Sequence, residues 1–140
     1  MSLFKIDMPN SCKYTSVLLI DDDIDDRMIF GEVLKELAPE ITYHEAINGE
    51  DALHKLTGEL APDIIFLDLN MPRVDGKQFL AEIRQQEHLR HIPVIIYTTS
   101  SHDSDKRETN ALGASYFLTK PNNLHELTHI LTSILQRKLF

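Results

Sequence analysis

The sequence predicts an α/β fold built on a parallel β-sheet, because two kinds of apolar pattern alternate along the chain. Short continuous apolar runs, typical of strands that are covered on both faces, occupy residues 17–20, 64–67, 94–97 and 116–118. Between them, apolar residues recur every three or four positions, as they do in helices that pack one face against a sheet. Parallel strands joined by right-handed helical crossovers produce this alternation.

Helical patterns fill the intervals between these runs and follow the last one. We expect five helices, around residues 25–37, 50–56, 79–83, 103–111 and 124–135. Residues 41–45 alternate apolar and polar side chains instead, which is typical of a strand at the edge of a sheet. The patterns leave the order of the strands open.

Length and composition favour one acidic domain. The chain has 140 residues and a formal net charge of −8, which argues against binding to nucleic acid or to an anionic membrane surface. Cys12 is the only cysteine, so no internal disulfide is possible, and a cytoplasmic location is expected. Residues 1–14 have the pattern of neither a signal peptide nor a spanning helix. We interpret them as an N-terminal extension to a domain at residues 15–140.

Polar side chains stand where the predicted strands end. The first apolar run is followed by Asp21 and Asp22, the next by Asp68, and the later strands lead to Thr98 and Lys120. In an open parallel sheet, ligands bind at the carboxyl ends of the strands, near the point where strand order reverses. Three carboxylates, a hydroxyl and an ammonium group are therefore expected at one edge of the sheet.

Such a group of carboxylates needs a cation. Two like charges about 4 Å apart repel by about 4 kcal/mol at an effective dielectric constant of about 20. Lys120 can offset only part of the charge of Asp21, Asp22 and Asp68. Oxygen ligands with room for water suit Mg²⁺. The sequence therefore predicts a Mg²⁺ site in which the lysine also takes part.

Four stretches resemble the receiver domain of bacterial response regulators: LLIDDD (18–23), DIIFLDLNMPRVDG (63–76), PVIIYTTS (93–100) and GASYFLTKP (113–121). The resemblance runs from Val17 to the end of the chain. It implies a flavodoxin-like, doubly wound sheet of five parallel strands in the order 2-1-3-4-5 with five helices. It also implies a signalling switch that a partner histidine kinase or phosphotransfer protein phosphorylates on an aspartate.

The resemblance assigns the acidic residues to two roles. Asp68 is similar to the aspartate that accepts the phosphoryl group. Asp22 and Asp68 would bind Mg²⁺ directly, together with the backbone carbonyl of Asn70, and Asp21 would reach the ion through water.

The same resemblance implies roles for residues on the later strands. Lys120 and Thr98 would each bind an oxygen of the phosphoryl group, and Phe117 stands at the position of the aromatic switch residue. The peptide bond between Lys120 and Pro121 would be cis. The surface that responds to phosphorylation would comprise residues 103–110, Tyr116 and the outward side of residues 123–139, and would bind an unknown downstream protein. A monomer or weak homodimer is expected.

Structural explanations compete with these roles. Asp25 and Asp26 are assigned to the first turn of a helix, where carboxylates favour the helix dipole, and Asp23 is left undecided. Thr98 alone could be an ordinary residue at a strand end, and Phe117 could be a core residue. The EF-hand calcium loop is rejected, because the position that requires glycine is occupied by Asp26.

Two other functions remain open. One is a Mg²⁺-dependent phosphohydrolase of the haloacid-dehalogenase type, but the threonine expected after Asp21 and Asp23 is missing. The other is a receiver-like scaffold that is never phosphorylated, which the complete set of acidic residues disfavours. The preferred prediction is a switch that is not an enzyme and that at most dephosphorylates itself slowly.

Overall fold

The structure is a computed structural model that describes residues 14–72 and 74–137. Its strands are β1 (Ser16–Ile20), β2 (Thr42–Ala46), β3 (Ile64–Leu67), β4 (Val94–Thr98) and β5 (Tyr116–Thr119). Its helices are α1 (Ile24–Leu37), α2 (Gly49–Leu56), α3 (Gly76–Arg84), α4 (Asp103–Ala111) and α5 (Leu124–Arg137). Within these residues the strands form one parallel sheet in the order β2-β1-β3-β4-β5. The predicted fold class and strand order are confirmed.

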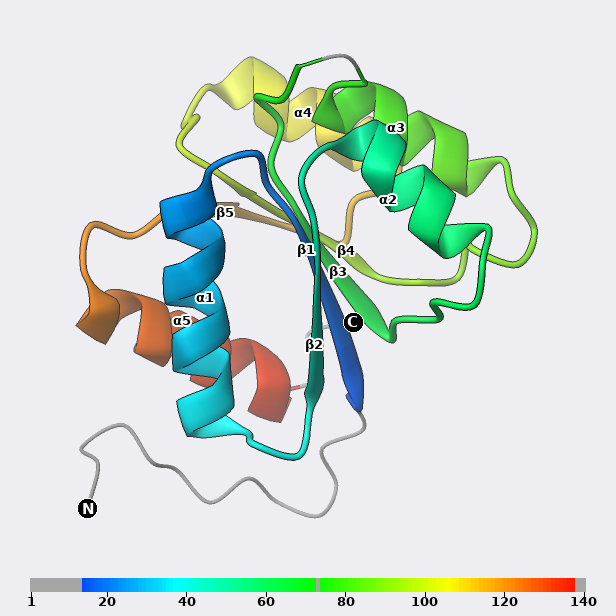
Figure 1. Cartoon of the computed structure of the whole chain (residues 1–140). Coiled ribbons are helices and arrows are strands. Elements are labelled where there is room, and N and C mark those ends of the chain that lie inside the picture. Colours follow the sequence, from blue (N-terminus) through cyan, green and yellow to red (C-terminus); the bar gives the residue numbers. More distant parts are fainter. Residues whose placement is uncertain (1–13, 73, 138–140) are drawn as a thin grey trace.

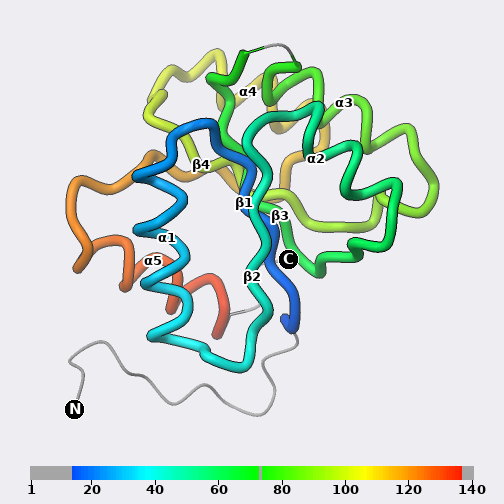
Figure 2. The backbone as a smooth tube through the Cα atoms, in the orientation of Figure 1, coloured from blue at the N-terminus to red at the C-terminus, as the bar shows by residue number. Residues whose placement is uncertain are grey.

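The helices cover both faces of the sheet. Figure 1 shows α1 and α5 on one face and α2, α3 and α4 on the other. In the backbone trace α1 and α5 run side by side (Figure 2). Because successive side chains of a strand point to opposite faces, the central strands supply two separate cores. Phe66 and its alternating neighbours pack toward α1 and α5, whereas Ile65 and Leu67 pack toward α2 and α3.

An aromatic cluster fills the core under α1. The ring of Phe30 lies 4.9 Å from that of Phe66 and 5.5 Å from that of Tyr97, in edge-on arrangements. Phe30 and Phe66 are almost completely buried. Aromatic pairs of this geometry contribute roughly 0.5–1.5 kcal/mol beyond the burial of their surface. The cluster fixes α1 against β3 and β4, and thereby fixes the position of the loop that leads into α1.

The register of the strands brings the predicted functional residues to one edge. Ile20 of β1 pairs with Leu67 of β3, so the residues that follow them are neighbours. The backbone N–H of Asp68 donates to the carbonyl of Ile20 at 3.0 Å. On the other side, the N–H of Lys120 donates to the carbonyl of Thr98 at 2.7 Å.

The start of the domain is held by Asp63. Oδ2 of Asp63 accepts hydrogen bonds from the backbone N–H of Thr15 at 2.6 Å, its hydroxyl at 2.7 Å and the N–H of Ser16 at 3.1 Å. Tyr14 is buried in the core beneath α1 and α5. Tyr14, the last residue of the predicted extension, thus packs with the core. The rest of the predicted extension, residues 1–13, lies outside the described residues.

Candidate functional site

Three carboxylates meet at the carboxyl ends of the central strands. Asp21 and Asp22 follow β1 and Asp68 follows β3, and each offers an oxygen within 4.8 Å of the other two. Asp21 and Asp68 are buried, whereas Asp22 is exposed. The structure thus brings together the three acidic side chains that the sequence predicted for this edge of the sheet.

Asp21 is the most deeply buried of the three. Its Oδ1 accepts a hydrogen bond from the backbone N–H of Asp23 at 2.9 Å. Its Oδ2 forms an ion pair with Nζ of Lys120 at 2.7 Å but has no partner in hydrogen-bond geometry. Burial raises the pKa of Asp21 to about 6, although the lysine and the Asp23 amide oppose the shift, and the charge of Asp68 adds to it. The positive charge and hydrogen-bond donors around Asp21 thus do not fully compensate for the burial of its carboxylate.

Lys120 supplies the positive charge of the site from the residue after β5. Its Nζ lies 2.7 Å from Asp21 Oδ2, 2.7 Å from Asp26 Oδ2 and 3.5 Å from Asp68 Oδ2. Burial alone would lower the pKa of Lys120, but its close contacts with the Asp21 and Asp26 carboxylates raise it above its usual value, and the charge of Asp68 adds to this effect. The lysine therefore remains a cation. The peptide bond between Lys120 and Pro121 is trans, so the expectation of a cis bond is wrong. X-Pro bonds have a modest preference for trans.

The contact between Lys120 and Asp26 gives Asp26 a second role, beside its predicted place in the first turn of α1. Asp26 does lie in the first turn of α1, but its Oδ2 accepts a hydrogen bond from Lys120 Nζ. That turn begins shortly after the site residues Asp21 and Asp22. This closeness in sequence to Asp21 and Asp22 was the signal that could have pointed to Asp26. The partner is 94 residues away in the sequence.

Asp23, which the sequence left undecided, is the N-cap of α1. Its Oδ1 accepts hydrogen bonds from the backbone N–H of Asp25 at 2.8 Å and of Asp26 at 3.1 Å. Caps of this kind stabilise a helix by about 1 kcal/mol. The acidic run is therefore divided between metal-type ligands, a helix cap and a partner for Lys120.

Arg27 is a further residue of the site that the sequence analysis missed. It is buried, its Nη1 donates to the carbonyl of Asp21 at 2.8 Å, and its Nε lies 3.5 Å from Glu45. The hydroxyl of Tyr43 lies 3.0 Å from both Glu45 Oε2 and the carbonyl of Arg27. Arg27 precedes Phe30 by three positions and therefore lies on the apolar face of α1. A charged residue on that face was the signal that could have identified it. Arg27 fixes the backbone of Asp21.

Thr98, Asn70 and Phe117 occupy different surroundings. Thr98 is completely buried at the end of β4, and its Oγ1 accepts a long contact, 3.5 Å, from the N–H of Ser100. Asn70 is exposed, and its N–H lies 3.4 Å from Asp68 Oδ1. Phe117 is half-buried on β5, with Nζ of Lys106 5.8 Å from its ring.

Gly76, the glycine that follows Asp68 in the sequence, lies too close to the Asp68 loop for any side chain. A side chain at this position would collide with the backbone of Asp68 and Leu69. The close approach lets α3 begin directly against the loop that carries Asp68. Asp75 and Gln78 complete this start as a capping box.

The donor set at this edge fits a hard divalent cation. All side chains of the cluster offer oxygen, the ligand type that Mg²⁺ and Ca²⁺ prefer. Lys120 contacts two carboxylates of the cluster, Asp21 and Asp68, and also pairs with Asp26. The buried Oδ2 of Asp21 lacks a hydrogen-bond donor. A bound cation would supply the missing positive charge.

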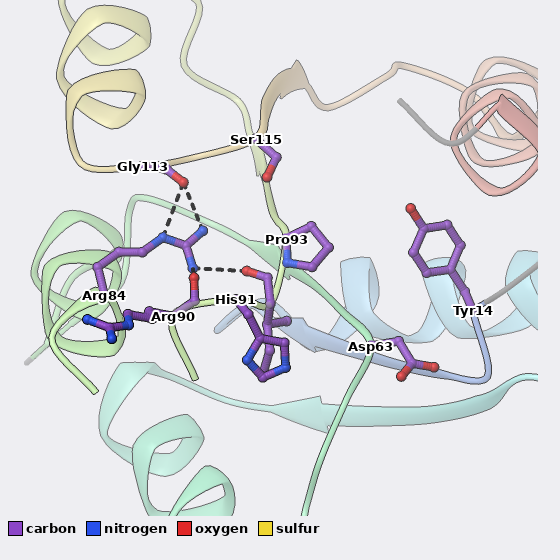
Figure 3. Close-up of a pocket in the computed structure, with 9 residues that line it drawn as sticks. Tyr14, Asp63, Arg84, Arg90, His91, Pro93, Gly113 and Ser115 are labelled. Atoms are coloured by element: carbon purple, nitrogen blue, oxygen red, sulfur yellow. Dashed lines mark hydrogen bonds between the residues drawn. The ribbon is translucent and has the colours of Figure 1, made fainter. Parts of the chain in front are cut away.

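A cavity of about 530 Å³ lies at the opposite end of the sheet, among residues that precede the strands. Figure 3 shows Tyr14 and Asp63 on one side and Arg84 on the other. The guanidinium of Arg84 donates to the carbonyls of Gly113 at 2.8 and 3.2 Å, Arg90 at 3.0 Å and Ile92 at 2.9 Å. Because these carbonyls use most of its donors, Arg84 acts as a structural clamp, and the carboxylate cluster remains the candidate functional site.

A doubly wound parallel sheet with acidic residues and a lysine at its carboxyl edge defines a receiver-type α/β domain. The model of the response regulator receiver domain family matches residues 17–132. The chain therefore belongs to this family, and it is a phosphorylation-dependent signalling switch. Membership does not favour the phosphohydrolase alternative.

Relatives agree with this assignment along most of the chain. The response regulator Rcp1 of Synechocystis sp. is 35% identical over 127 residues, which cover 84% of each protein. The crystal structure of the phosphorylated cyanobacterial phytochrome response regulator RcpA is similar with a TM-score of 0.81 and 27% identity, covering 89% of this chain and 96% of that one. The Mn²⁺-bound form of Rcp1 gives a TM-score of 0.79 at 34% identity, covering 89% and 94%.

One relative joins such a domain to a kinase. The sensor histidine kinase CheAY of Helicobacter pylori is 36% identical over 115 residues, which are 81% of this chain but only 14% of that protein.

Within residues 14–72 and 74–137, no helix combines the length and the apolar character needed to cross a bilayer.

Proposed function

We propose that Asp68 is the phosphoryl acceptor of this switch. Its carboxylate is buried at the end of β3, beside Asp21 and Asp22 and 3.5 Å from Lys120. An oxygen of Asp68 attacks the phosphorus of a phosphohistidine, the P–N bond breaks, and the imidazole nitrogen keeps the electron pair and takes up a proton. The product is an acyl phosphate on Asp68. The observation that carries the proposal is the cluster of Asp21, Asp22 and Asp68, with Lys120 beside two of the three carboxylates.

Mg²⁺ is the cofactor proposed for this step. Asp22 and Asp68 would bind it directly with the carbonyl of Asn70, and Asp21 would bind through water. The ion supplies charge that lets an anionic carboxylate meet an anionic phosphoryl group. The Mn²⁺-bound form of Rcp1 supports a divalent ion, and the oxygen-only donor set supports Mg²⁺.

Lys120 and Thr98 would recognise the phosphoryl group once it is in place. Lys120 pairs with one oxygen, and the Thr98 hydroxyl, whose one hydrogen bond among residues 14–72 and 74–137 is the long contact with Ser100, donates to another. Two such charge-assisted bonds contribute about 3–6 kcal/mol in total. A shift from 1:99 to 99:1 between two states requires about 5.5 kcal/mol. These contacts are therefore large enough to drive the switch, with Phe117 as the moving aromatic residue.

The signal would enter from a sensor histidine kinase or a phosphotransfer protein, as the fusion in CheAY suggests. It would leave through α4, Tyr116 on β5 and the outward side of α5, which bind a downstream protein. Of the predicted surface, residues 138–139 lie outside the described residues. We propose a cytoplasmic monomer or weak homodimer whose acyl phosphate hydrolyses slowly.

Phosphorylation with a small donor tests the acceptor. Wild-type protein incubated with acetyl phosphate and Mg²⁺ should gain one phosphoryl group by intact mass, and Asp68→Asn should gain none. Asp63→Asn is a matched control, because this aspartate lies at the opposite end of β3. An undiminished adduct in Asp68→Asn would contradict the assignment. Rapid turnover of a generic phosphate ester would instead favour the hydrolase.

A further inference from the structure

Lys120 is shared among carboxylates that differ in their access to water. Its Nζ lies 2.7 Å from both Asp21 and Asp26, and 3.5 Å from Asp68. The Asp21 side chain is 0% exposed and that of Asp68 is 6% exposed, whereas that of Asp26 is 35% exposed. A lysine ammonium has three N–H donors and no acceptor. Its positive charge is therefore already paired with three carboxylates before a phosphoryl group arrives.

A phosphoryl group on Asp68 would bring additional oxygen acceptors to Lys120, so the lysine must give up one of its present partners. Releasing Asp21 would leave a fully buried carboxylate without its cation, which is costly. Releasing Asp26 costs less, because water can solvate a side chain that is one-third exposed. Asp26 is therefore the partner that Lys120 exchanges.

We propose that Asp26 is a positioning residue that holds Lys120 toward α1 and competes with the phosphoryl group for its ammonium. Asp26 thereby lowers the affinity of the site for a phosphoryl group. It acts through Lys120, since it is not among the three carboxylates that lie within 4.8 Å of one another. This inference rests on the proposed role of Asp68 as the acceptor.

Asp25 provides a matched control for Asp26. Both residues lie in the first turn of α1, and substitution by asparagine removes one negative charge from either position. Asp25 is exposed, and within residues 14–72 and 74–137 its side chain forms no hydrogen bond or ion pair. A difference between Asp26→Asn and Asp25→Asn therefore reports the contact with Lys120 rather than the loss of charge.

The test is a titration with beryllofluoride, a phosphoryl mimic, at saturating Mg²⁺, followed through the amide NMR signals of Thr98 and Lys120. Asp26→Asn should bind the mimic roughly two- to fivefold more tightly than Asp25→Asn, the range expected for a partly exposed ion pair. Equal or weaker binding by Asp26→Asn would overturn the inference alone, provided that wild-type protein binds. Failure of the wild-type protein to bind would overturn the role of Asp68 and this inference together.

A second measurement needs no variant. In wild-type protein, the carboxyl ¹³C signal of Asp26 should shift as beryllofluoride binds, because the carboxylate loses Lys120 and gains water. The signal of Asp25 should stay in place. An Asp26 signal that does not move while Thr98 and Lys120 respond would contradict the exchange, even if Asp26→Asn failed to fold.

Discussion

The two ends of the sheet satisfy their charged side chains in opposite ways. At the amino end, Asp63 accepts hydrogen bonds from Thr15 and Ser16, and Arg84 donates to backbone carbonyls. At the carboxyl end, Lys120 is divided among acidic side chains, and Asp21 keeps a buried oxygen without a hydrogen-bond donor.

This difference separates architecture from function. Charges that are satisfied by backbone amides and carbonyls cannot change partners unless the chain itself moves. Charges that are satisfied by other side chains can exchange them for an ion or a phosphoryl group. The amino end is thus built to stay fixed, and the carboxyl end is built to respond.

The largest effect is expected from Lys120→Met, which removes the cation from the carboxyl end. Breaking a buried ion pair by deleting one partner typically costs about 3–5 kcal/mol, so urea unfolding without metal should show a loss of that order. Added Mg²⁺ should restore part of the loss, because it binds only the folded state.

Lys35→Met serves as the control for this variant. Lys35 is an exposed lysine in the last turn of α1, so its loss should change the free energy of unfolding little. If Lys120→Met were as stable as Lys35→Met, the carboxyl end would not depend on the lysine.

Arg84→Ala should weaken the amino end without affecting the carboxyl end. It removes the hydrogen bonds to Gly113, Arg90 and Ile92, with an expected loss of about 2–3 kcal/mol of unfolding free energy. The affinity for Mg²⁺ should stay that of the wild type. The exposed Arg107 of α4 provides the control substitution Arg107→Ala. A large fall in Mg²⁺ affinity with Arg84→Ala would show that the two ends are coupled.

Gly113→Ala perturbs the same clamp from the opposite side. Gly113 has a φ of 98°, and an added Cβ would lie 2.9 Å from Nε of Arg84. The strained backbone alone should cost about 1–2 kcal/mol, measured by urea unfolding. Gly58→Ala should be nearly neutral, since the nearest atom to an added Cβ, the Lys55 carbonyl oxygen, would be 3.4 Å away. Equal stability of both variants would contradict the need for glycine at position 113.

The smallest effect concerns acid stability at Asp63. Burial alone would raise the pKa of Asp63, but hydrogen bonds from Thr15 and Ser16 outweigh it and lower the pKa below the usual value. A lowered pKa stabilises the fold above the ordinary aspartate pKa of 3.8, and this contribution is lost as the pH falls through the lowered pKa.

Comparing the pH dependence of urea unfolding in wild type and Asp63→Asn isolates this contribution. It should be below about 1 kcal/mol, because water screens a partly exposed carboxylate. Thr15→Val, which removes one of the donors, should retain part of it. If the wild type and Asp63→Asn lost stability in parallel below pH ~4, the hydrogen bonds of Asp63 would not be the cause.

Much of the fold could be predicted because the relevant signals are local. The continuous apolar runs marked β1, β3 and β4, and the alternating run marked the edge strand β2, one residue from its observed bounds. The meeting of Asp21, Asp22 and Asp68 also followed, since the ends of neighbouring parallel strands share an edge. Asp23 stayed ambiguous, because a helix cap and a site ligand require the same residue type.

The amino-acid sequence determined which residues form strands and which polar groups follow them, because both depend on short-range patterns and on the geometry of a parallel sheet. Only the tertiary structure decided that Lys120 contacts Asp26 as well as Asp21, and that Arg27 turns inward to the Asp21 carbonyl. These contacts depend on how helix α1 is set against the sheet and on where flexible side chains from distant segments end. No local sequence pattern predicts these contacts, because the burial and charge interactions that stabilise them exist only in the assembled site.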